Sequence, residues 1–138
     1  MTDVVDTERF TQVFAGTPVV FAYLFGSRVT GSSRPDSDAD VAVLLDDSVT
    51  ATRHLDVRLE LSRRLEPVLG AEVDVVVLND VRLAVAGRVV QQRRVLYSRD
   101  EPARVQFESR VMKEYLDFRI HQLPLARQML EQIAAGER

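Results

Sequence analysis

Three short runs of β-branched and aromatic residues constrain the fold of this chain more than any other feature of its sequence. Residues 19–25, 40–45 and 73–78 each have the composition and length of a buried strand. Each run is followed by glycine, serine, aspartate or asparagine, which are typical of turns. Residues 94–98 predict a short fourth strand. Strands that alternate with helices bury their apolar faces in a layered α/β or α+β domain, here with a small mixed sheet of three to four strands.

Helical periodicity fills the segments between these runs. Residues 6–15, 50–69 and 81–91 each predict a helix. Glycine at position 70 is well placed to end the second helix, and the Asn-Asp pair at residues 79–80 to begin the third. The apolar face of the second helix is expected to consist of Leu55 and Leu59, then Leu61 or Ser62, then Leu65 and Leu69.

The C-terminal part of the chain, from about residue 102 to residue 136, also has a helical pattern. One apolar face is expected from side chains at spacings of four, four and three residues: Phe107, Val111, Tyr115 and Phe118. Pro124 is expected to kink or divide this region, with residues 125–135 as its second segment. We predict a single domain over residues 1–138, with a core at about residues 17–100 and a helical C-terminal tail at about residues 102–136.

Composition and charge exclude several classes of protein. The 18 basic and 21 acidic residues give a formal net charge of -3, which argues against direct binding of nucleic acid through its phosphates. The chain has no cysteine, so disulfides, cysteine-ligated zinc and thiol catalysis are excluded. No apolar run is long enough to span a membrane, and the first residues lack the pattern of a signal peptide. We therefore expect a cytoplasmic protein without a membrane partner.

The most informative motif is a Gly-Ser pair followed, ten residues later, by two aspartates. Gly26 and Ser27 leave the first predicted strand, and Asp38 and Asp40 stand at the start of the second. Alternation along a strand places the two carboxylates on the same face, where their charges repel. A hard divalent cation such as Mg²⁺ removes this repulsion, since it takes carboxylate and phosphate oxygens as ligands. Carboxylates alone do not distinguish Mg²⁺ from Mn²⁺.

A third carboxylate, Asp74, stands among valines in the third predicted strand. If Val73, Val75 and Val77 pack on one face, Asp74 shares the opposite face with Val76. An ionised aspartate on a sheet face is costly without a partner. Beside the other two aspartates it could complete a metal site and accept a proton from an attacking hydroxyl group.

The Gly-Ser pair and the residue after it predict a phosphate-binding turn. Glycine at position 26 allows the backbone to approach a phosphate closely, and the Ser27 hydroxyl can donate a hydrogen bond to it. Arg28 adds a cation directly after the pair. These residue types predict a site for a phosphorylated ligand next to the acidic residues.

Together these residues resemble the nucleotidyltransferase superfamily typified by DNA polymerase β. Its motif is Gly-Ser, about ten residues, Asp-x-Asp and a third acidic residue on a later strand. The matching residues here are Gly26, Ser27, Asp38, Asp40 and Asp74. The compact length and residues 73–79 look most like the minimal nucleotidyltransferase (MNT) group, which includes MntA-type antitoxins paired with HEPN ribonuclease toxins. The resemblance covers residues 19–118.

This resemblance implies a reaction, its cofactors and a partner. AMP would pass from ATP to a hydroxyl group, and pyrophosphate would leave. The expected acceptor is a tyrosine of a HEPN toxin. One Mg²⁺ would be held by Asp38 and Asp40, and a second would be shared with Asp74. Gly26, Ser27 and Arg28 would bind the nucleotide.

Two alternatives stay open at this point. The chain could be a transferase that acts on a small hydroxylated molecule, such as an aminoglycoside, although 138 residues is short for such an enzyme. It could also be an antitoxin that acts by binding alone. Three converging acidic residues argue against this second alternative, because a pure binding protein does not need them.

Overall fold

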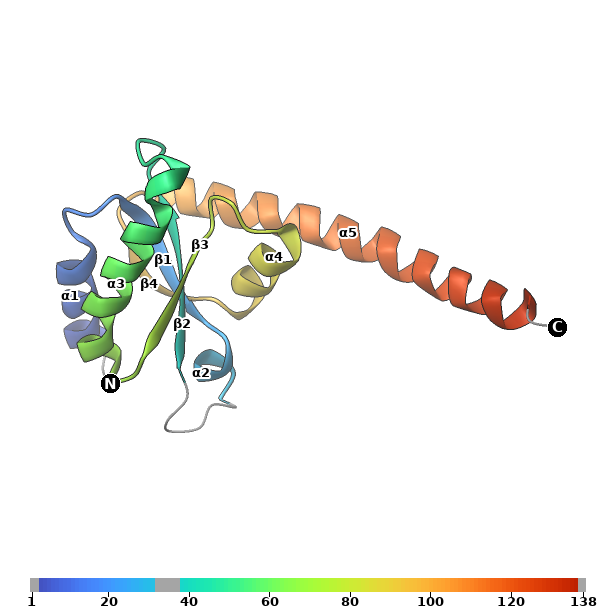
Figure 1. Cartoon of the computed structure of the whole chain (residues 1–138), viewed down its shortest axis with the longest axis horizontal. Helices are drawn as coiled ribbons and strands as arrows, with labels where there is room; N and C mark the ends of the chain where they lie inside the picture. The colour runs from blue at the N-terminus through green and yellow to red at the C-terminus, as the bar shows by residue number, and fades with distance from the viewer. Residues whose placement is uncertain (1–2, 32–37, 137–138) are drawn as a thin grey trace.

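The computed structural model describes the backbone of residues 3–31 and 38–136, and the side chains of residues 7–31, 38–122 and 128–136. The mixed α+β architecture predicted from the sequence is confirmed (Figure 1). The elements in chain order are α1 (Asp3–Phe14), β1 (Val19–Phe25), α2 (Ser27–Thr30), β2 (Ala39–Leu45), the 3₁₀ turn η1 (Ala51–Arg53), α3 (His54–Leu69), β3 (Val73–Val77), α4 (Leu83–Gln92), β4 (Arg94–Ser98) and α5 (Glu101–Gly136).

The four strands form one mixed sheet in the order β3-β2-β1-β4. β1 pairs antiparallel with both β2 and β4, whereas β2 and β3 are parallel. Parallel neighbours need a crossover connection, which α3 supplies here. The register places Phe25 opposite Asp40 and Asp40 opposite Asp74, so that three neighbouring strands meet at one end of the sheet.

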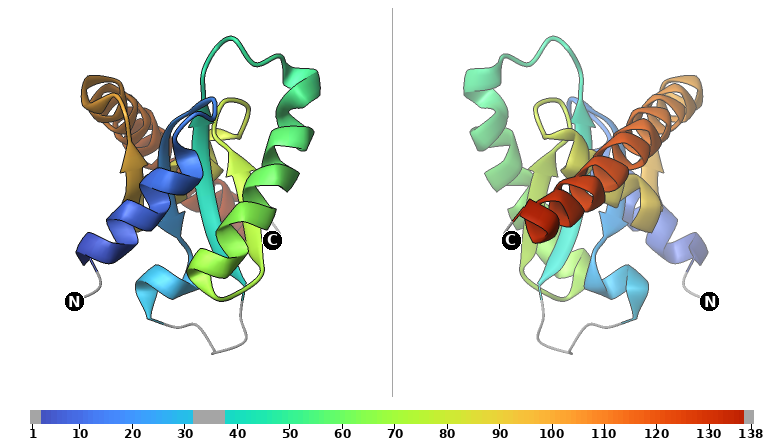
Figure 2. Two further views of the ribbon diagram at one scale, coloured as in Figure 1. Left: turned by 90° about the vertical axis from the view of Figure 1, so that its left-hand side faces the viewer. Right: turned by 90° about the vertical axis from the view of Figure 1, so that its right-hand side faces the viewer.

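The two faces of the sheet have separate apolar cores. α1 and α3 cover one face, and α4 and the first part of α5 cover the other (Figures 1 and 2). In β3, Val73, Val75 and Val77 point into the core under α1 and α3, and Val76 packs on the opposite side. The predicted alternation in this strand is therefore confirmed, and Asp74 shares its face with Val76.

The buried face of α3 differs from the predicted leucine stripe. Leu61 and Leu65 are buried, but Leu55 and Leu59 are 57% and 62% exposed. The core-facing stripe instead consists of Val57, Leu61, Leu65, Val68 and Leu69. A helix with leucines on two adjacent sides offers two stripes of similar spacing, and only the position of the sheet selects one of them.

Side chains cover the backbone groups at the outer edge of β3. The Arg58 Nε group donates to the carbonyl oxygen of Val75 at 2.8 Å, and the Ser62 hydroxyl donates to that of Val73 at 2.6 Å. Asn79 forms two hydrogen bonds with the backbone of Leu45, both 2.9 Å long. Its predicted role at the start of the next helix is wrong, because Asn79 extends the strand pairing instead. The residue that precedes α4 as its N-cap is arginine at position 82.

α5 begins on the sheet and then projects away from the domain (Figure 1). It runs without a break through Pro124, so the predicted division of this region is wrong. A proline removes one backbone hydrogen bond, which a long helix with intact bonds on both sides can tolerate. Phe107 and Val111 are buried as predicted, but Phe118 is 44% exposed because the helix has left the core by that point. Within the described residues, no helix combines the length and hydrophobicity that crossing a membrane requires.

A buried polar cluster fixes the first turns of α5 to the sheet. The Tyr23 hydroxyl donates to Glu108 at 2.7 Å, and Arg93 and Arg104 lie 3.1 and 2.7 Å from the same carboxylate oxygen. Burial and the Glu108 contact raise the pKa of Tyr23, so its hydroxyl remains a hydrogen-bond donor. This cluster holds α5 in one orientation where it crosses the domain.

Candidate active site

The end of the sheet where β1 ends and β2 and β3 begin brings two acidic side chains together. Asp40 is the second residue of β2 and Asp74 is the second residue of β3. They are direct partners in the parallel register and lie on the same face of the sheet. Because a parallel pair places partner side chains side by side, these two carboxylates face the same space.

A cavity of about 330 Å³ opens over this acid pair. We call it the acidic cavity, and its lining residues are Phe25, Gly26, Ser27, Thr30, Asp40, Asp74, Val76, Arg88 and Gln92. These residues come from β1, α2, β2, β3 and α4. Elements far apart in the sequence therefore contribute to one site.

Gly26 allows the turn after β1 to approach the acid pair. Its φ angle is +83°, which lies in the left-handed region that favours glycine. A Cβ atom at this position would lie 2.4 Å from the Oδ2 atom of Asp40. The Gly26 N–H donates to the Gln92 side-chain oxygen at 3.0 Å, so α4 holds this turn in place. The predicted need for glycine at this position is explained by the Asp40 carboxylate as well as by the turn.

The electrostatics of the acidic cavity favour a bound cation. Burial raises the pKa of the Asp40 carboxyl above its usual value, and the negative charge of Asp74 raises it further. Asp38 adds a smaller effect in the same direction, while the positive charge of Arg88 opposes it. A ligand that carries positive charge would relieve the repulsion between these acidic residues.

The predicted site residues divide into two groups. Gly26, Ser27, Asp40 and Asp74 all line the acidic cavity. Asp38 directly precedes β2 and is exposed.

Arg28 lies in α2 and is half-buried. Among the side chains of residues 7–31, 38–122 and 128–136, no group of three or more histidine or acidic residues is arranged to hold a metal ion. The catalytic, metal and nucleotide roles assigned from the sequence therefore stay predictions.

Sequence reasoning missed two residues of α4 that line the acidic cavity, Arg88 and Gln92. They are four residues apart and hence one helical turn apart on the same side. The sequence signal that could have found them is that they lie on the polar side of this helix. The other side is buried and includes Ala86, Val89 and Val90. That signal shows that the two side chains face out of the core, but it does not show which site they face.

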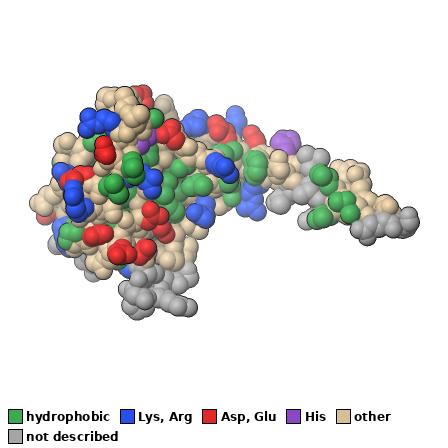
Figure 3. All heavy atoms as spheres, viewed as in Figure 1, with side chains coloured by type: hydrophobic (Ala, Val, Ile, Leu, Met, Phe, Trp, Pro, Cys, Tyr) green, Lys and Arg blue, Asp and Glu red, His purple; other side chains and the backbone are tan. Residues whose placement is uncertain are grey.

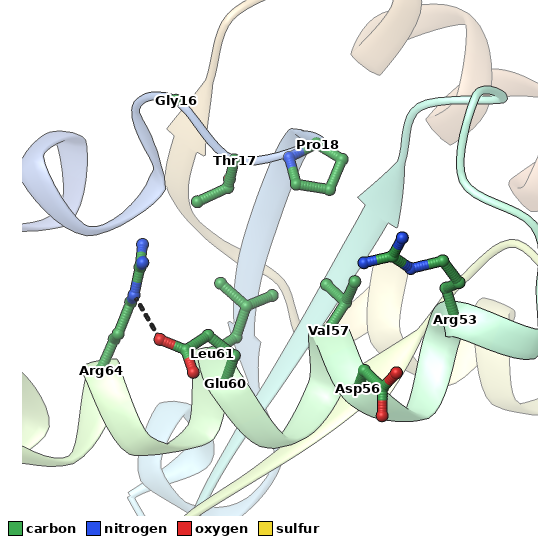
Figure 4. A pocket seen from close by; sticks show the side chains of 9 residues that line it. All are labelled: Gly16, Thr17, Pro18, Arg53, Asp56, Val57, Glu60, Leu61 and Arg64. Atoms are coloured by element: carbon green, nitrogen blue, oxygen red, sulfur yellow. Dashed lines mark hydrogen bonds and ion pairs between the residues drawn. The ribbon is translucent and has the colours of Figure 1, made fainter.

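A second hollow, of about 370 Å³, lies between the turn before β1 and α3 (Figure 4). Arg64 pairs with Glu60 there at 3.0 Å, and Arg53 and Asp56 also line the hollow. Its charges are balanced, and it lies near the start of β1, whereas the acidic cavity lies at the end of that strand. We therefore place the candidate active site at the acidic cavity.

One protein family matches most of this chain. The sequence pattern of the family described as Polymerase beta, Nucleotidyltransferase matches residues 8–102, which is more than half of the chain. The matched range includes every residue that lines the acidic cavity. No match was found among curated proteins.

Several solved structures have the same fold. A toxin–antitoxin crystallised with AMP-PNP is 22% identical, has a TM-score of 0.67, and covers 90% of this chain and 98% of its own. A toxin–antitoxin called MntA-HepT is 20% identical, with a TM-score of 0.63 and coverages of 91% and 97%. A tri-AMPylated Shewanella oneidensis HEPN toxin in complex with its MNT antitoxin gives 20% identity, a TM-score of 0.64, and the same coverages. At this level of identity, the likeness shows a shared fold.

Proposed function

Because this chain belongs to the polymerase β nucleotidyltransferase family, we propose that it transfers AMP from ATP to a hydroxyl group of a protein partner. The proposed partner is a HEPN-type toxin, the proposed acceptor is one of its tyrosines, and the proposed result is a silenced toxin. The observation that carries this proposal is the pairing of Asp40 with Asp74 beside Gly26 and Ser27 in one cavity. This is the combination of metal-ligand and phosphate-binding groups that nucleotidyl transfer requires.

The residues of the site fit Mg²⁺. Carboxylate oxygens are hard donors, and the raised pKa of Asp40 indicates that its negative charge is poorly compensated by the protein itself. Asp38, Asp40 and Asp74 would hold the metal, in two positions if two ions bind. When bound, Mg²⁺ would neutralise charge on the triphosphate and on the departing pyrophosphate.

The residues of this chain would position the reactants for a single displacement. The acceptor oxygen forms a bond with the α-phosphorus of ATP, and the bond between this phosphorus and the oxygen bridging it to the β-phosphate breaks. Asp74, which is exposed at the rim, would accept the hydroxyl proton. Ser27 and Arg28 would hold phosphate oxygens by donating hydrogen bonds.

The projecting part of α5 supports a protein acceptor. Leu116, Ile120, Leu130 and Ile133 are all exposed on this helix, and Figure 3 shows hydrophobic side chains along it. Apolar side chains that are exposed on a projecting helix are typical of protein contacts. The similar solved structures include complexes of HEPN toxins with MNT antitoxins, which also supports this choice of partner.

Intact-protein mass spectrometry tests the proposal directly. The chain is incubated with the proposed HEPN-type partner, ATP and Mg²⁺. We expect the partner to gain one AMP mass or a whole multiple of it, and fragmentation to locate the adduct on a tyrosine.

Asp38→Asn and Asp40→Asn should abolish the mass gain. Asp56→Asn is the matched control, because Asp56 is exposed on α3 and lies in the other hollow. A partner that co-purifies without any adduct would contradict the proposal in favour of inhibition by binding. An adduct on a small hydroxylated molecule instead would identify the other alternative.

A further inference from the structure

We propose that the Arg88 guanidinium binds phosphate oxygens of the nucleotide in the acidic cavity. This role rests on the proposed function. In it, Arg88 offsets the negative charge that the acidic residues present to an anionic substrate. Arg88 lies in the second turn of α4, and its side chain lines the cavity together with Ser27, Asp40 and Asp74.

The charge of the lining residues is the first reason. Among the lining residues that the structure describes, Asp40 and Asp74 are acidic and Arg88 alone is basic. Arg88 also acts electrostatically on Asp40, which places its positive charge near the acid pair. ATP brings several negative charges of its own, so a fixed cation at this position reduces the repulsion that the substrate meets.

The availability of the Arg88 donors is the second reason. Among the residues that the structure describes, no carboxylate lies within 4.0 Å of the Arg88 guanidinium. By contrast, Arg93 and Arg104 are both paired with Glu108, and Arg58 donates to the backbone of β3. The guanidinium of Arg88 therefore keeps its planar set of donors for a ligand, a geometry that matches phosphate.

The position of α4 is the third reason. Gly87, the residue before Arg88, lies so close to α5 that a Cβ atom would meet the Tyr115 ring at 2.2 Å. Val89 and Val90 are fully buried, and Gln92 is bonded to Gly26. The backbone that carries Arg88 is thus fixed on two sides, which directs its side chain toward the cavity without a rearrangement of the helix.

The test is the affinity of the chain for AMP-PNP, measured by isothermal titration calorimetry with Mg²⁺ and again with EDTA. We expect Arg88→Ala to weaken binding about 10- to 100-fold, as is usual for the loss of hydrogen bonds to a charged group. Arg88→Lys should lose affinity by a smaller factor, because lysine keeps the charge but not the planar donors.

Arg82→Ala is the matched control, since Arg82 is an exposed arginine at the start of the same helix and does not line the cavity. It should bind AMP-PNP like the wild type, and all three variants should unfold at the wild-type temperature. Wild-type affinity in Arg88→Ala would overturn the inference.

The inference and the proposed function fail in different experiments. If the wild type binds AMP-PNP through Arg88 but transfers no AMP to the HEPN partner, the proposed function is wrong and the phosphate-binding role stands. If Arg88→Ala transfers AMP with an unchanged KM for ATP, the phosphate-binding role is wrong and the function stands.

Discussion

The two faces of the sheet are built from alternate residues of the same strands, yet Asp40 and Asp74 lie together on only one of them. On the face under α1 and α3, Val41, Val43 and Val75 are buried in a continuous apolar core. On the opposite face, the same strands begin with Asp40 and Asp74 before the apolar core resumes. In each of these strands, the aspartate on one face and the buried valine on the other face are neighbours in the sequence.

The difference follows from how far each face is covered by helices. α3 packs along β3, and its side chains reach the carbonyl groups of the strand edge. α4 leaves an open cavity between its exposed side and the ends of the strands. Carboxylates at this end keep contact with water and can meet a ligand, which the fully covered face does not allow.

Asp40→Asn is the most direct test of the difference between the two faces, because it removes one negative charge from the face with the acidic cavity. We expect AMP transfer to fall about 10²- to 10⁴-fold, the range that acid–base and metal-ligand groups contribute. The free energy of unfolding should not fall, since the charged form of Asp40 is disfavoured by burial and by Asp74. Single-turnover transfer assays and urea unfolding measure the two effects, and a variant that unfolds at neutral pH would contradict the assigned role.

The same substitution has a predictable pH dependence. The pKa of Asp40 in the folded chain lies above its ordinary value of 3.8, so the wild type carries a cost of ionisation at neutral pH. Asp40→Asn should therefore be the more stable protein at neutral pH, and its advantage should shrink as the pH falls through the folded-state pKa toward 3.8. An advantage that grows on acidification would contradict this assignment.

Leu65→Ala tests the face of the sheet that is covered by α1 and α3. Leu65 is fully buried between α3 and the sheet, so its truncation should lower the free energy of unfolding by about 2–5 kcal/mol. AMP transfer by the folded fraction should stay at the wild-type rate, because the acidic cavity lies across the sheet. Thermal unfolding combined with assays well below the melting temperature checks both parts. A large loss of turnover in fully folded protein would show that the faces are coupled.

Gln92→Ala tests how the face with the acidic cavity is held in place, because α4 fixes the turn after β1 through Gln92. It removes the acceptor of the Gly26 N–H, and an unpaired donor of this kind costs about 1–3 kcal/mol. AMP transfer should fall with stability, since the turn next to Asp40 is loosened. Gln91→Ala is the matched control, because Gln91 is exposed and does not line the cavity. Equal behaviour of the two variants would contradict a positioning role for Gln92.

Leu59→Ala should have the smallest effect and separates the two sides of α3. Leu59 is exposed, so we expect a change in the free energy of unfolding within about 0.5 kcal/mol. Chemical denaturation beside Leu65→Ala gives the comparison in one helix. A destabilisation as large as that of Leu65→Ala would show that Leu59 is buried in solution.

The strands, and the aspartates near their starts, were predictable from the sequence for a local reason. A valine-rich run with a single aspartate buries Val73 and Val75 on one face of the strand. Alternation along the strand then places Asp74 on the other face. The Gly-Ser turn and Asp40 were predictable on the same basis. The stripe of α3 that packs on the sheet was not, because two leucine-bearing sides had similar periodicity and only tertiary packing distinguishes them.

By itself, then, the sequence determined the order of the strands and helices and the charged residues at the strand ends, since these depend on the residues next to one another. The tertiary structure alone decided that Asp40 and Asp74 are register partners, that Gln92 holds Gly26, and that Arg88 faces the same cavity. It also decided that α5 continues beyond the domain with apolar side chains exposed. Such contacts join residues distant in the chain, and local periodicity carries no information about which distant element a helix face will meet.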